Sequence, residues 1–532
     1  MSKHKMRCFP GLVILSLLLA CCGGTPTASP RPSATPSPSP PVPTHTPAPT
    51  QTPAPTLPPV EGAEPSPRVA AFYYPWYRSL EVDRGWAHWN EPAFDPPLDI
   101  ASDYYPQLGA YSSLDRAVVA QHLAWLREAG VGVIVSSWWG RQSREEKAVP
   151  LLLEMGERYG IKIAFHLEPY SGRTATTLVS DVKYLYARYG EHPAFFRTTA
   201  ASRWSPDDRP KGLFFLWSSR FPDSETPAVE ATYWREAMDA IHALPDGGLV
   251  ISDETVSEWV DGGHFDGLYS YAVLQLGDAY SWARSLPPDA WYVPGVNPGF
   301  SAVRIGYEAS TYVPRRGGDA YEERWQAALD TGVEPDLVAI TSFNEWHEGT
   351  QIEPAAAGAA NGSGHTYEDY DPLAPDGYLD LTRQWVDRFL AKTWPKPTRI
   401  RFRVVTSSDW TTFGLADGAS WLRPSVVSAS AEADYAGPEG DRFLLTQSLA
   451  RAESGKNVEM VVDILLIGTE GSELLVFEIE RGHVGSTQVE ISSYRGTEPV
   501  VVASFVWGGI APGERNAQQF QVPVSSMMEP AP

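Results

Sequence analysis

The chain has 532 residues, enough for two or three domains, and its formal net charge of −23 excludes the basic surface that nucleic-acid binding requires. Its 19 Trp and 24 Tyr residues supply flat aromatic faces, which serve either a large core or the stacking of sugar rings. The three cysteines all lie within residues 1–22, so the rest of the chain contains no disulfide, thiolate metal site or cysteine nucleophile.

Residues 1–22 are predicted to be a lipoprotein signal peptide. A positively charged start precedes an apolar stretch, 12–20, that is too short to span a bilayer. The stretch ends in the letters LLAC, which resemble a bacterial lipobox, so we expect Cys21 to be acylated; the alternative is an ordinary secretory leader. The expected location is the extracellular face of a bacterial cell membrane, with the lipid at Cys21 as the only membrane contact, or alternatively the medium after secretion.

Residues 23–67 are almost entirely Pro, Thr, Ala and Ser, a composition that cannot bury enough apolar surface to fold. The segment is predicted to be a disordered linker. Proline keeps such a chain extended at about 3.1 Å per residue, so the linker could hold a domain on the order of 100 Å from a membrane.

Residues 68–396 alternate between strand-like and helix-like patterns. Such alternation predicts parallel strands joined by crossover helices, and eight such units predict a (β/α)8 TIM barrel, an α/β fold. A doubly wound open sheet is the alternative, which the lack of a Gly-rich phosphate loop after the first strand disfavours. The expected strands are 68–77, 131–139, 161–170, 212–217, 248–253, 265–271, 291–297 and 337–343, and the expected helices are 115–129, 143–159, 176–189, 229–243, 278–286, 319–331 and 377–391.

Active sites of this fold lie at the C-terminal ends of the strands, where polar and aromatic residues gather in this chain. Any one of these aromatic residues could instead serve core packing, but core packing is a weaker explanation for the whole set. The segment 341–354, TSFNEWHEGTQIEP, is the richest in such residues. Glu345 and Glu348 are three positions apart, a spacing that brings both side chains to one side of a turn.

Two carboxyl groups in one pocket can hydrolyse a glycosidic bond, one as acid and the other as base or nucleophile. The alternative is a solvated loop, which the apolar neighbours Phe343, Trp346 and Ile352 disfavour. No HExxH or cysteine-based metal pattern and no GxSxG elbow occurs.

These residues resemble glycoside hydrolase family 99, the endo-α-1,2-mannosidases and mannanases. The resemblance runs from about residue 69 to 394 and rests on the ordered blocks AFYYPWY (71–77), SWWG (137–140), FHLEPYSGR (165–173), GEHPAF (190–195), PGVNPGFSAVR (294–304) and TSFNEWHEGTQIEPA (341–355). The PGVNPGF block is a loose match, and an insertion at 355–376 leaves the outer subsites open.

The resemblance implies a retaining endo-acting enzyme that needs no cofactor or metal and takes α-mannan or a mannose-containing oligosaccharide. It implies that Glu345 deprotonates the sugar's 2-hydroxyl, which attacks C1 to form a 1,2-anhydro sugar, while Glu348 protonates the leaving oxygen. The Trp at position 139, where vertebrate relatives have Tyr, favours a mannan-type substrate. Expected substrate-binding residues are Tyr74, Trp139, His166, Glu168, Tyr170, His192, Tyr271, Arg304 and Asn344.

Residues 397–532 change to short alternating segments, 399–405, 443–447, 457–467, 473–480, 486–493 and 498–507, which predict an all-β, sandwich-like accessory module. It could bind glycans through Trp410, Trp421 or Trp507, or serve only as packing against the barrel.

Two rival functions remain for the whole chain, a non-catalytic glycan-binding surface lipoprotein and a barrel α-glucanase. We expect a monomer.

Overall fold

The computed structural model describes residues 57–523, apart from 92, 363, 395–397, 416–419, 440–441, 468–473, 483, 496–497 and 508–516. The signal peptide, Cys21 and most of the proposed linker lie outside the described residues.

A ring of parallel strands forms the first folded part, in the order β8-β7-β6-β5-β3-β2-β1-β10-β9. Strand β8 pairs with β7 and β9 pairs with β10, and only Pro294 separates β8 from β9 along the chain. These two short strands therefore share one position and close the ring, which confirms the predicted (β/α)8 barrel. The strands are β1 (Ser66–Tyr73), β2 (Val131–Trp138), β3 (Lys162–Leu167), β5 (Lys211–Leu216), β6 (Leu249–Ser252), β7 (Gly267–Tyr269), β8 (Trp291–Val293), β9 (Gly295–Val296) and β10 (Val338–Ile340), with β4 (Arg197–Thr198) antiparallel to β5.

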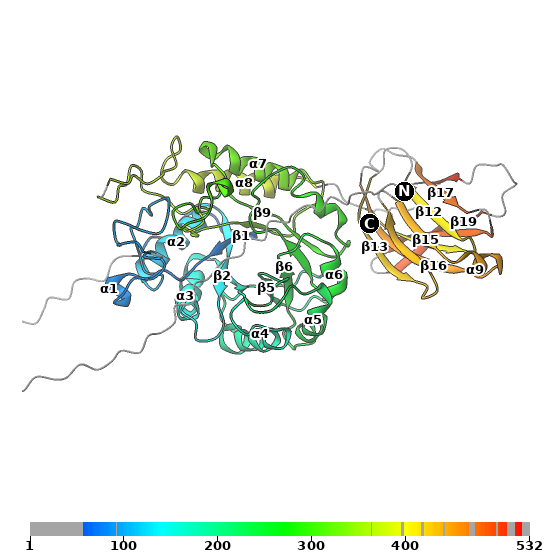
Figure 1. Cartoon of the computed structure of the whole chain (residues 1–532), viewed down its shortest axis with the longest axis horizontal. Coiled ribbons are helices and arrows are strands. Elements are labelled where there is room, and N and C mark those ends of the chain that lie inside the picture. The colour runs from blue at the N-terminus through cyan, green and yellow to red at the C-terminus, as the bar shows by residue number, and fades with distance from the viewer. Residues whose placement is uncertain are drawn as a thin grey trace, which may run out of the picture. The chain divides into compact units, whose positions relative to one another are not determined.

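The barrel strands are buried on both faces, as parallel strands covered by helices must be. On β1, Ala70 and Phe72 belong to the core inside the ring, whereas Ala71 and Tyr73 belong to the core between the ring and the helices. Figure 1 shows the strands at the centre of the barrel and the helices around them. The helices are α1 (Leu80–Asp83), α2 (Arg116–Glu128), α3 (Val149–Tyr159), α4 (Ala175–Tyr189), α5 (Arg235–His242), α6 (Glu258–Gly263), α7 (Asp319–Leu329) and α8 (Gly377–Ala391).

Local capping chemistry fixes where these helices begin and end. The Asp115 side chain accepts a hydrogen bond from the backbone N–H of Ala117 at the start of α2, and Thr174 forms a capping box with Thr177 at the start of α4. Gly160 ends α3 in the left-handed conformation, at φ 71°. The predicted helix 278–286 is only a short 3-10 helix, Ser281–Ser285, and α6 was not predicted.

The second folded part contains two antiparallel five-stranded sheets, β13-β16-β11-β18-β19 and β14-β15-β12-β17-β20. Ile400, Phe402 and Val404 of β11 point into a shared apolar core. This arrangement confirms the all-β, sandwich-like module. Its strands are β11 (Thr398–Thr406), β12 (Trp410–Leu415), β13 (Ser420–Ala429), β14 (Tyr435–Glu439), β15 (Arg442–Thr446), β16 (Val458–Ile467), β17 (Leu474–Arg481), β18 (Thr487–Arg495), β19 (Glu498–Trp507) and β20 (Ala517–Pro523), with α9 (Leu449–Glu453) after β15.

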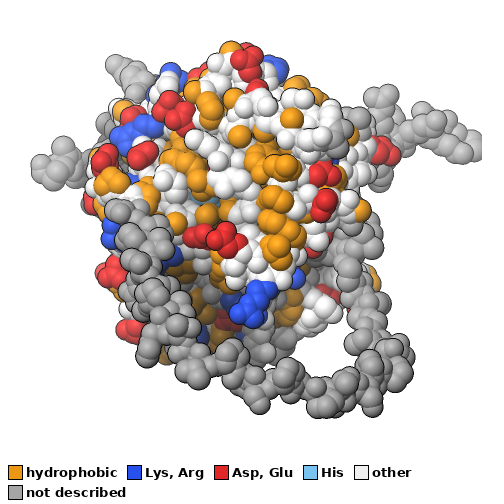
Figure 2. Space-filling model, turned by 90° about the vertical axis from the view of Figure 1, so that its left-hand side faces the viewer, with side chains coloured by type: hydrophobic (Ala, Val, Ile, Leu, Met, Phe, Trp, Pro, Cys, Tyr) orange, Lys and Arg blue, Asp and Glu red, His pale blue; other side chains and the backbone are white. Residues whose placement is uncertain are grey.

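The surface carries charges of both signs. On the face shown in Figure 2, acidic and basic side chains are interspersed with hydrophobic ones, and no basic patch dominates it. Within the described residues, no helix has both the length and the apolar character needed to cross a bilayer.

Candidate active site

The predicted site residues come from the segments that follow the C-terminal ends of four strands. Tyr74 follows β1, Trp139 follows β2, Glu168 follows β3, and Glu345 and Glu348 lie on the loop after β10. Because the strands of the ring are parallel, these ends lie on the same side of the barrel.

The loop 342–353 is folded back on itself, so that its two ends are hydrogen-bonded. The Ser342 N–H donates to the Thr350 carbonyl at 2.8 Å, and the Glu353 N–H donates to the Phe343 carbonyl at 2.9 Å. Inside the loop, the Ser342 hydroxyl accepts the Glu345 N–H at 2.7 Å. Glu345 and Glu348 are therefore presented by a closed and internally bonded segment.

Burial raises the pKa of both carboxyl groups. The pKa of Glu345 is raised well above its usual value by burial and by the charge of Glu348, while the backbone N–H groups of His347 and Glu348 act in the opposite direction. The pKa of Glu348 is raised to about 7 by burial and by the charge of Glu168. The pair therefore holds a proton close to neutral pH, as an acid–base pair requires.

Hydrogen bonding distinguishes the two carboxyl groups. An oxygen of Glu345 accepts the His347 N–H at 3.1 Å, which favours negative charge on Glu345. The Oε2 atom of Glu348 is buried and receives no hydrogen bond from the part of the chain that the structure describes. Glu345 is therefore reached by a backbone donor, whereas Oε2 of Glu348 has no such donor within the described residues.

A third carboxyl group, that of Glu168, lies beside this pair. One of its oxygens accepts the Ser137 hydroxyl at 2.8 Å and lies 3.0 Å from Nδ1 of His166. The Nε2 atom of His166 forms a hydrogen bond of 2.8 Å with the Tyr269 hydroxyl. Glu168 and His166 are thus held by their neighbours at the base of the site.

Two tyrosines complete the polar part of the site. The hydroxyl groups of Tyr74 and Tyr271 are hydrogen-bonded to each other. Burial raises the pKa of both, and the charges of Glu168, Glu345 and Glu348 raise it further. These effects require the three carboxyl groups to lie near the tyrosine pair. The five residues therefore form one cluster.

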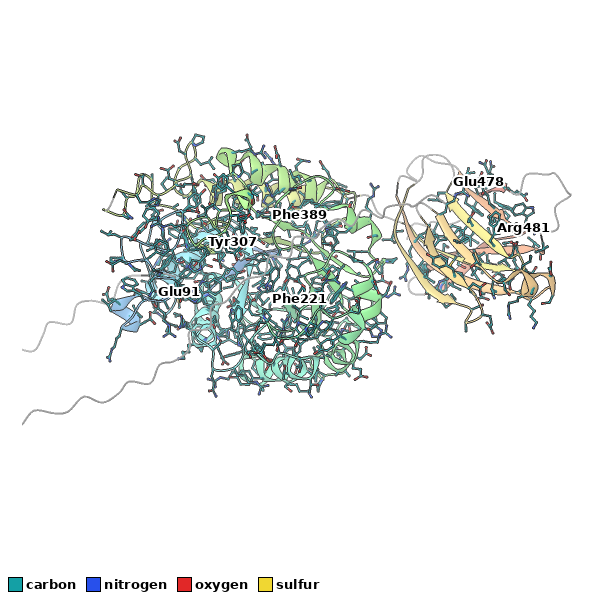
Figure 3. All side chains as sticks on the ribbon, in the orientation of Figure 1. Glu91, Phe221, Tyr307, Phe389, Glu478 and Arg481 are labelled. Carbon is teal, nitrogen blue, oxygen red and sulfur yellow. The ribbon has the colours of Figure 1, made fainter. Side chains whose placement is uncertain are left out.

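Further aromatic rings surround this cluster. The ring of Trp217, at the end of β5, lies 4.7 Å from that of Tyr271 and 5.7 Å from that of His166, measured between centroids. Trp76 stacks on His88 at 4.6 Å. Tyr307, labelled in Figure 3, has a pKa raised by burial and by the charges of Glu348 and Glu345. Trp217 could have been predicted, because it is an aromatic residue at the end of a strand.

Arg173 secures the loop that carries Trp217. Its fully buried guanidinium group donates hydrogen bonds to five backbone carbonyls, those of Leu167, Trp217, Ser218, Phe221 and Pro222, at 2.5–3.3 Å. Figure 3 labels Phe221, one of the residues whose carbonyl accepts from Arg173. Burial lowers the pKa of Arg173 to about 10, and the charge of Asp253 acts in the opposite direction.

Two expected substrate contacts, Trp139 and Tyr170, are both half-buried. Trp139 is half-buried at the end of β2. Tyr170 donates its hydroxyl hydrogen to Asp181 of α4, and burial and this hydrogen bond raise its pKa to about 12. The ring of Tyr170 also lies beside Gly140, where an added Cβ would approach it to 3.3 Å.

The amide of Asn344, an expected sugar contact, bonds to the backbone of Tyr74. Its amide oxygen accepts the Tyr74 N–H at 2.7 Å, and its amide nitrogen donates to the Tyr74 carbonyl at 3.1 Å. The same nitrogen contacts the Tyr111 hydroxyl at 3.3 Å, and the side chain is fully buried. Both ends of the amide are therefore used to place Tyr74.

His192 and Arg304 also differ from expectation. His192 lines a surface cavity with Lys162, the first residue of β3, and so lies at the opposite end of the barrel from the carboxyl groups. Arg304 forms an ion pair with Asp99 and donates to the Ile100 carbonyl at 2.8 Å. His192 is therefore excluded from the site, and the guanidinium group of Arg304 is held by the loop before α2.

Across the described residues, no group of three or more His, Cys, Asp or Glu side chains has an arrangement that could hold a metal ion.

In the accessory module, Trp507 packs on the core and lies beneath the Arg481 guanidinium at 4.8 Å. Trp410 is half-buried, and the side chain of Trp421 lies outside the described part.

A (β/α)8 barrel with a buried, proton-sharing carboxyl pair at the C-terminal ends of its strands defines a glycoside hydrolase. Residues 66–391, more than half of the chain, match the model of Glycosyl hydrolase family 99, and the chain belongs to that family.

Relatives and solved structures agree with this assignment. The chain is 34% identical over 358 residues to a glycoprotein endo-alpha-1,2-mannosidase-like protein of Danio rerio, a match that covers 60% of this chain and 78% of the relative. It is 32% identical to the glycoprotein endo-alpha-1,2-mannosidase of Mus musculus, covering 60% and 74%. The GH99 endo-alpha-mannosidase structure from Bacteroides thetaiotaomicron superposes with a TM-score of 0.53 at 31% identity, over 61% of this chain and 98% of that one.

Proposed function

We propose that this protein is a retaining endo-α-mannosidase that cleaves internal α-1,2-mannosidic linkages in α-mannan or related mannose glycans. The observation that carries the proposal is the buried pair Glu345 and Glu348, which holds a proton near neutral pH beside a third carboxyl group, Glu168. The mannose specificity follows from the relatives, which are named endo-α-mannosidases.

In the proposed mechanism the substrate supplies its own nucleophile. Glu345 removes the proton from the 2-hydroxyl as that oxygen attacks C1, and Glu348 gives its proton to the leaving oxygen as the C1–O bond breaks. Glu348 then takes a proton from water, which attacks C1 of the 1,2-anhydro sugar, and Glu345 returns a proton to O2. Two inversions at C1 give net retention. The backbone donor on Glu345 supports this division of roles, as does Oε2 of Glu348, which has no hydrogen-bond partner among the described residues.

Product analysis tests the proposal. The protein is incubated separately with α-mannan, a glucosylated mannose oligosaccharide and an α-glucan. Early products are separated by size while NMR follows the newly formed anomer. Oligosaccharides that appear before monosaccharides, with the α-anomer formed first, support it. Cleavage of an α-glucan instead, or binding of mannan without cleavage, would favour one of the two rival functions.

A substrate analogue separates the 1,2-anhydro route from direct attack. A 2-fluoro mannoside lacks the internal nucleophile, so we expect no turnover and no adduct. If Glu345 attacks C1 directly, the same compound should leave a covalent glycosyl group on Glu345, visible as added mass on the intact protein. That adduct would overturn the mechanism and leave the enzyme class in place.

A further inference from the structure

A buried polar network lies behind the loop of Glu345 and Glu348. Glu353, at the end of that loop, is fully buried and accepts three hydrogen bonds. The Trp346 indole N–H donates to its Oε2 at 2.9 Å, the Tyr111 hydroxyl donates to the same oxygen at 2.8 Å, and Nε2 of His122 lies 3.1 Å from Oε1. Three converging donors suit an ionised carboxylate, which only accepts.

His122 extends the network to the barrel wall. It lies on α2 and is fully buried, and its Nδ1 atom forms a hydrogen bond of 3.0 Å with the Tyr73 hydroxyl of β1. With the proton on Nε2, His122 donates to Glu353 and accepts from Tyr73, so every partner is satisfied. Glu353 is thereby attached to two elements of the barrel, α2 and β1.

Trp346 is the link between this network and the carboxyl pair, because it lies in the chain between Glu345 and Glu348. Besides the indole bond to Glu353, the backbone N–H of Trp346 donates to the Tyr77 hydroxyl at 3.1 Å, and its backbone carbonyl accepts the Ser102 hydroxyl at 2.8 Å. The indole bond is the only one of these three that runs to the loop's own end. A shift of Trp346 would therefore displace both Glu345 and Glu348.

We propose that Glu353, supported by His122, is the positioning residue for the carboxyl pair and acts through the indole N–H of Trp346. The proposal rests on the roles given to Glu345 and Glu348 in the proposed function. It concerns geometry only, since Glu353 lies behind the loop and touches no reacting atom.

The test compares kcat with KM in variants of the network. Glu353→Leu removes the acceptor, and we expect kcat to fall about 100-fold, the effect of misplacing reacting groups by about 1 Å. KM should change less than about threefold, because Trp139, Tyr271 and Trp217 lie on other segments. Glu353→Gln should recover most of the activity, since its carbonyl oxygen can face Trp346 while His122 changes tautomer to accept from its amide.

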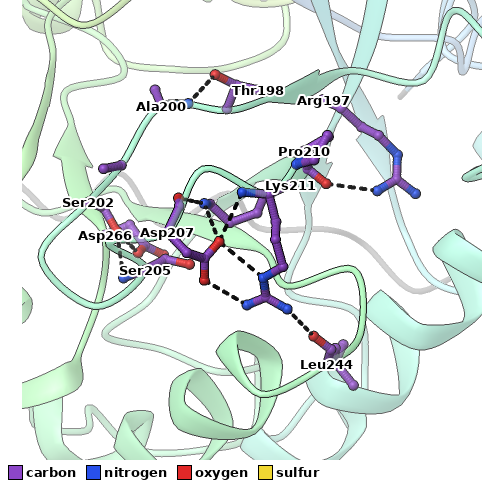
Figure 4. Close-up of polar contacts among 12 residues, drawn as sticks. Arg197, Thr198, Ala200, Ser202, Ser205, Asp207, Pro210, Lys211, Leu244 and Asp266 are labelled. Atoms are coloured by element: carbon purple, nitrogen blue, oxygen red, sulfur yellow. Dashed lines mark hydrogen bonds and ion pairs between the residues drawn. The ribbon is translucent and has the colours of Figure 1, made fainter.

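Asp266 offers a matched control at the other end of the barrel. It is also fully buried and paired with a histidine, His242, at 3.0 Å, and it accepts the hydroxyl of Ser202. Figure 4 shows Asp266 beside Ser202 and Ser205, next to the segment that leads into β5. Asp266→Leu should lower the melting temperature and leave kcat of the folded protein unchanged.

Two further measurements keep the inference testable on their own. Trp346→Phe removes the indole donor together with part of the buried ring and leaves Glu353 in place. We expect a loss in kcat of about tenfold that does not add to that of Glu353→Leu. This variant tests the inference if Glu353→Leu does not fold. Hydrogen exchange of the peptide 341–354 should accelerate in Trp346→Phe and Glu353→Leu and not in Asp266→Leu, whatever substrate the wild type cleaves. Unchanged exchange, or an equal kcat loss in Asp266→Leu, overturns the inference, whereas a wild type inactive on mannan overturns only the proposed function.

Discussion

At the scale of single residues, the unequal hydrogen bonding of Glu345 and Glu348 leads to different sensitivities to the leaving group. Glu348→Gln should nearly abolish cleavage of a natural mannoside and cost far less with an aryl or fluoride leaving group, which needs little protonation. Glu345→Gln should slow both substrates by about 10²–10⁴-fold, because a lost general base acts on O2 in each case. Steady-state kinetics on both substrates check this, and equal losses in Glu348→Gln would contradict the assignment.

The raised pKa of Glu348 also makes the stability of the folded chain depend on pH. Its carboxyl group titrates at about 7 in the folded chain, above its usual value, so its contribution to stability is present at low pH and is lost as pH rises through about 7. Glu348→Gln should therefore be more stable than the wild type at pH 8, by up to about 3 kcal/mol, and nearly equal to it at pH 4. Thermal unfolding at both pH values measures the difference. A stability difference between Glu348→Gln and the wild type that grows toward low pH would contradict this sign. The activity of the wild type should fall as the pH rises above 7.

Trp139 is the residue on which substrate preference is expected to depend. Its half-buried ring offers an apolar face at the end of β2. In Trp139→Tyr we expect the preference for mannose over glucose in the neighbouring sugar site to narrow by about 1–3 kcal/mol, or roughly tenfold to two-hundredfold. The measurement is the ratio of kcat/KM for two substrates that differ only in that sugar. An unchanged ratio would remove Trp139 from the specificity site.

At the scale of elements, Arg173 joins the ends of β3 and β5 through backbone carbonyls alone. A lysine has a single ammonium group and cannot reach five carbonyls, so Arg173→Lys should lower the free energy of unfolding by about 2–4 kcal/mol. We also expect kcat/KM to fall about tenfold, because Trp217 loses its support. Arg127→Lys is the control, since Arg127 is also buried and bonds to the Tyr159 carbonyl away from the site. A purely structural role for Arg173 would show the same stability loss without the kinetic one.

The eight barrel strands were predictable because each is an apolar run buried on both faces, between helices with clear caps. In the accessory module the prediction missed β13, β14 and β20, which lie at sheet edges, where strands tolerate polar residues and proline; the sequence YAGPE of β14 is an example. It also missed the central strand β12, which is short and contains Gly414.

Among the site residues, the sequence identified carboxylates and aromatics at strand ends but not their partners. Asn344 bonds to Tyr74 across 270 positions, a pairing that no local pattern reveals. The position of His192 could have been derived, because it follows a helix and precedes a strand and so belongs to the N-terminal end of the barrel. The role inferred for Glu353 required the three-dimensional contacts.

At the scale of the whole molecule, we propose that the enzyme is anchored by lipid at Cys21 and held away from the membrane by the Pro-rich segment. Cys21→Ala should release the protein from membranes or block its processing, because acylation needs the thiol. Fractionation of cells that express each form, with detection of the barrel, checks this. Membrane association that survives in the variant would leave an ordinary secretory leader or another attachment as the explanation.

Strand β1, the first of the ring, pairs with β10, and the loop of Glu345 and Glu348 begins just after β10. Pairing of β1 with β10 joins Val69 to Val338, so this ladder forms only after most of the barrel's chain has been synthesised and ordered. Contacts so distant in sequence are slow to form during folding. A partly folded barrel can therefore hold many of its helices and strands while its catalytic groups are still apart, and hydrolytic activity becomes a reporter of ring closure rather than of secondary structure.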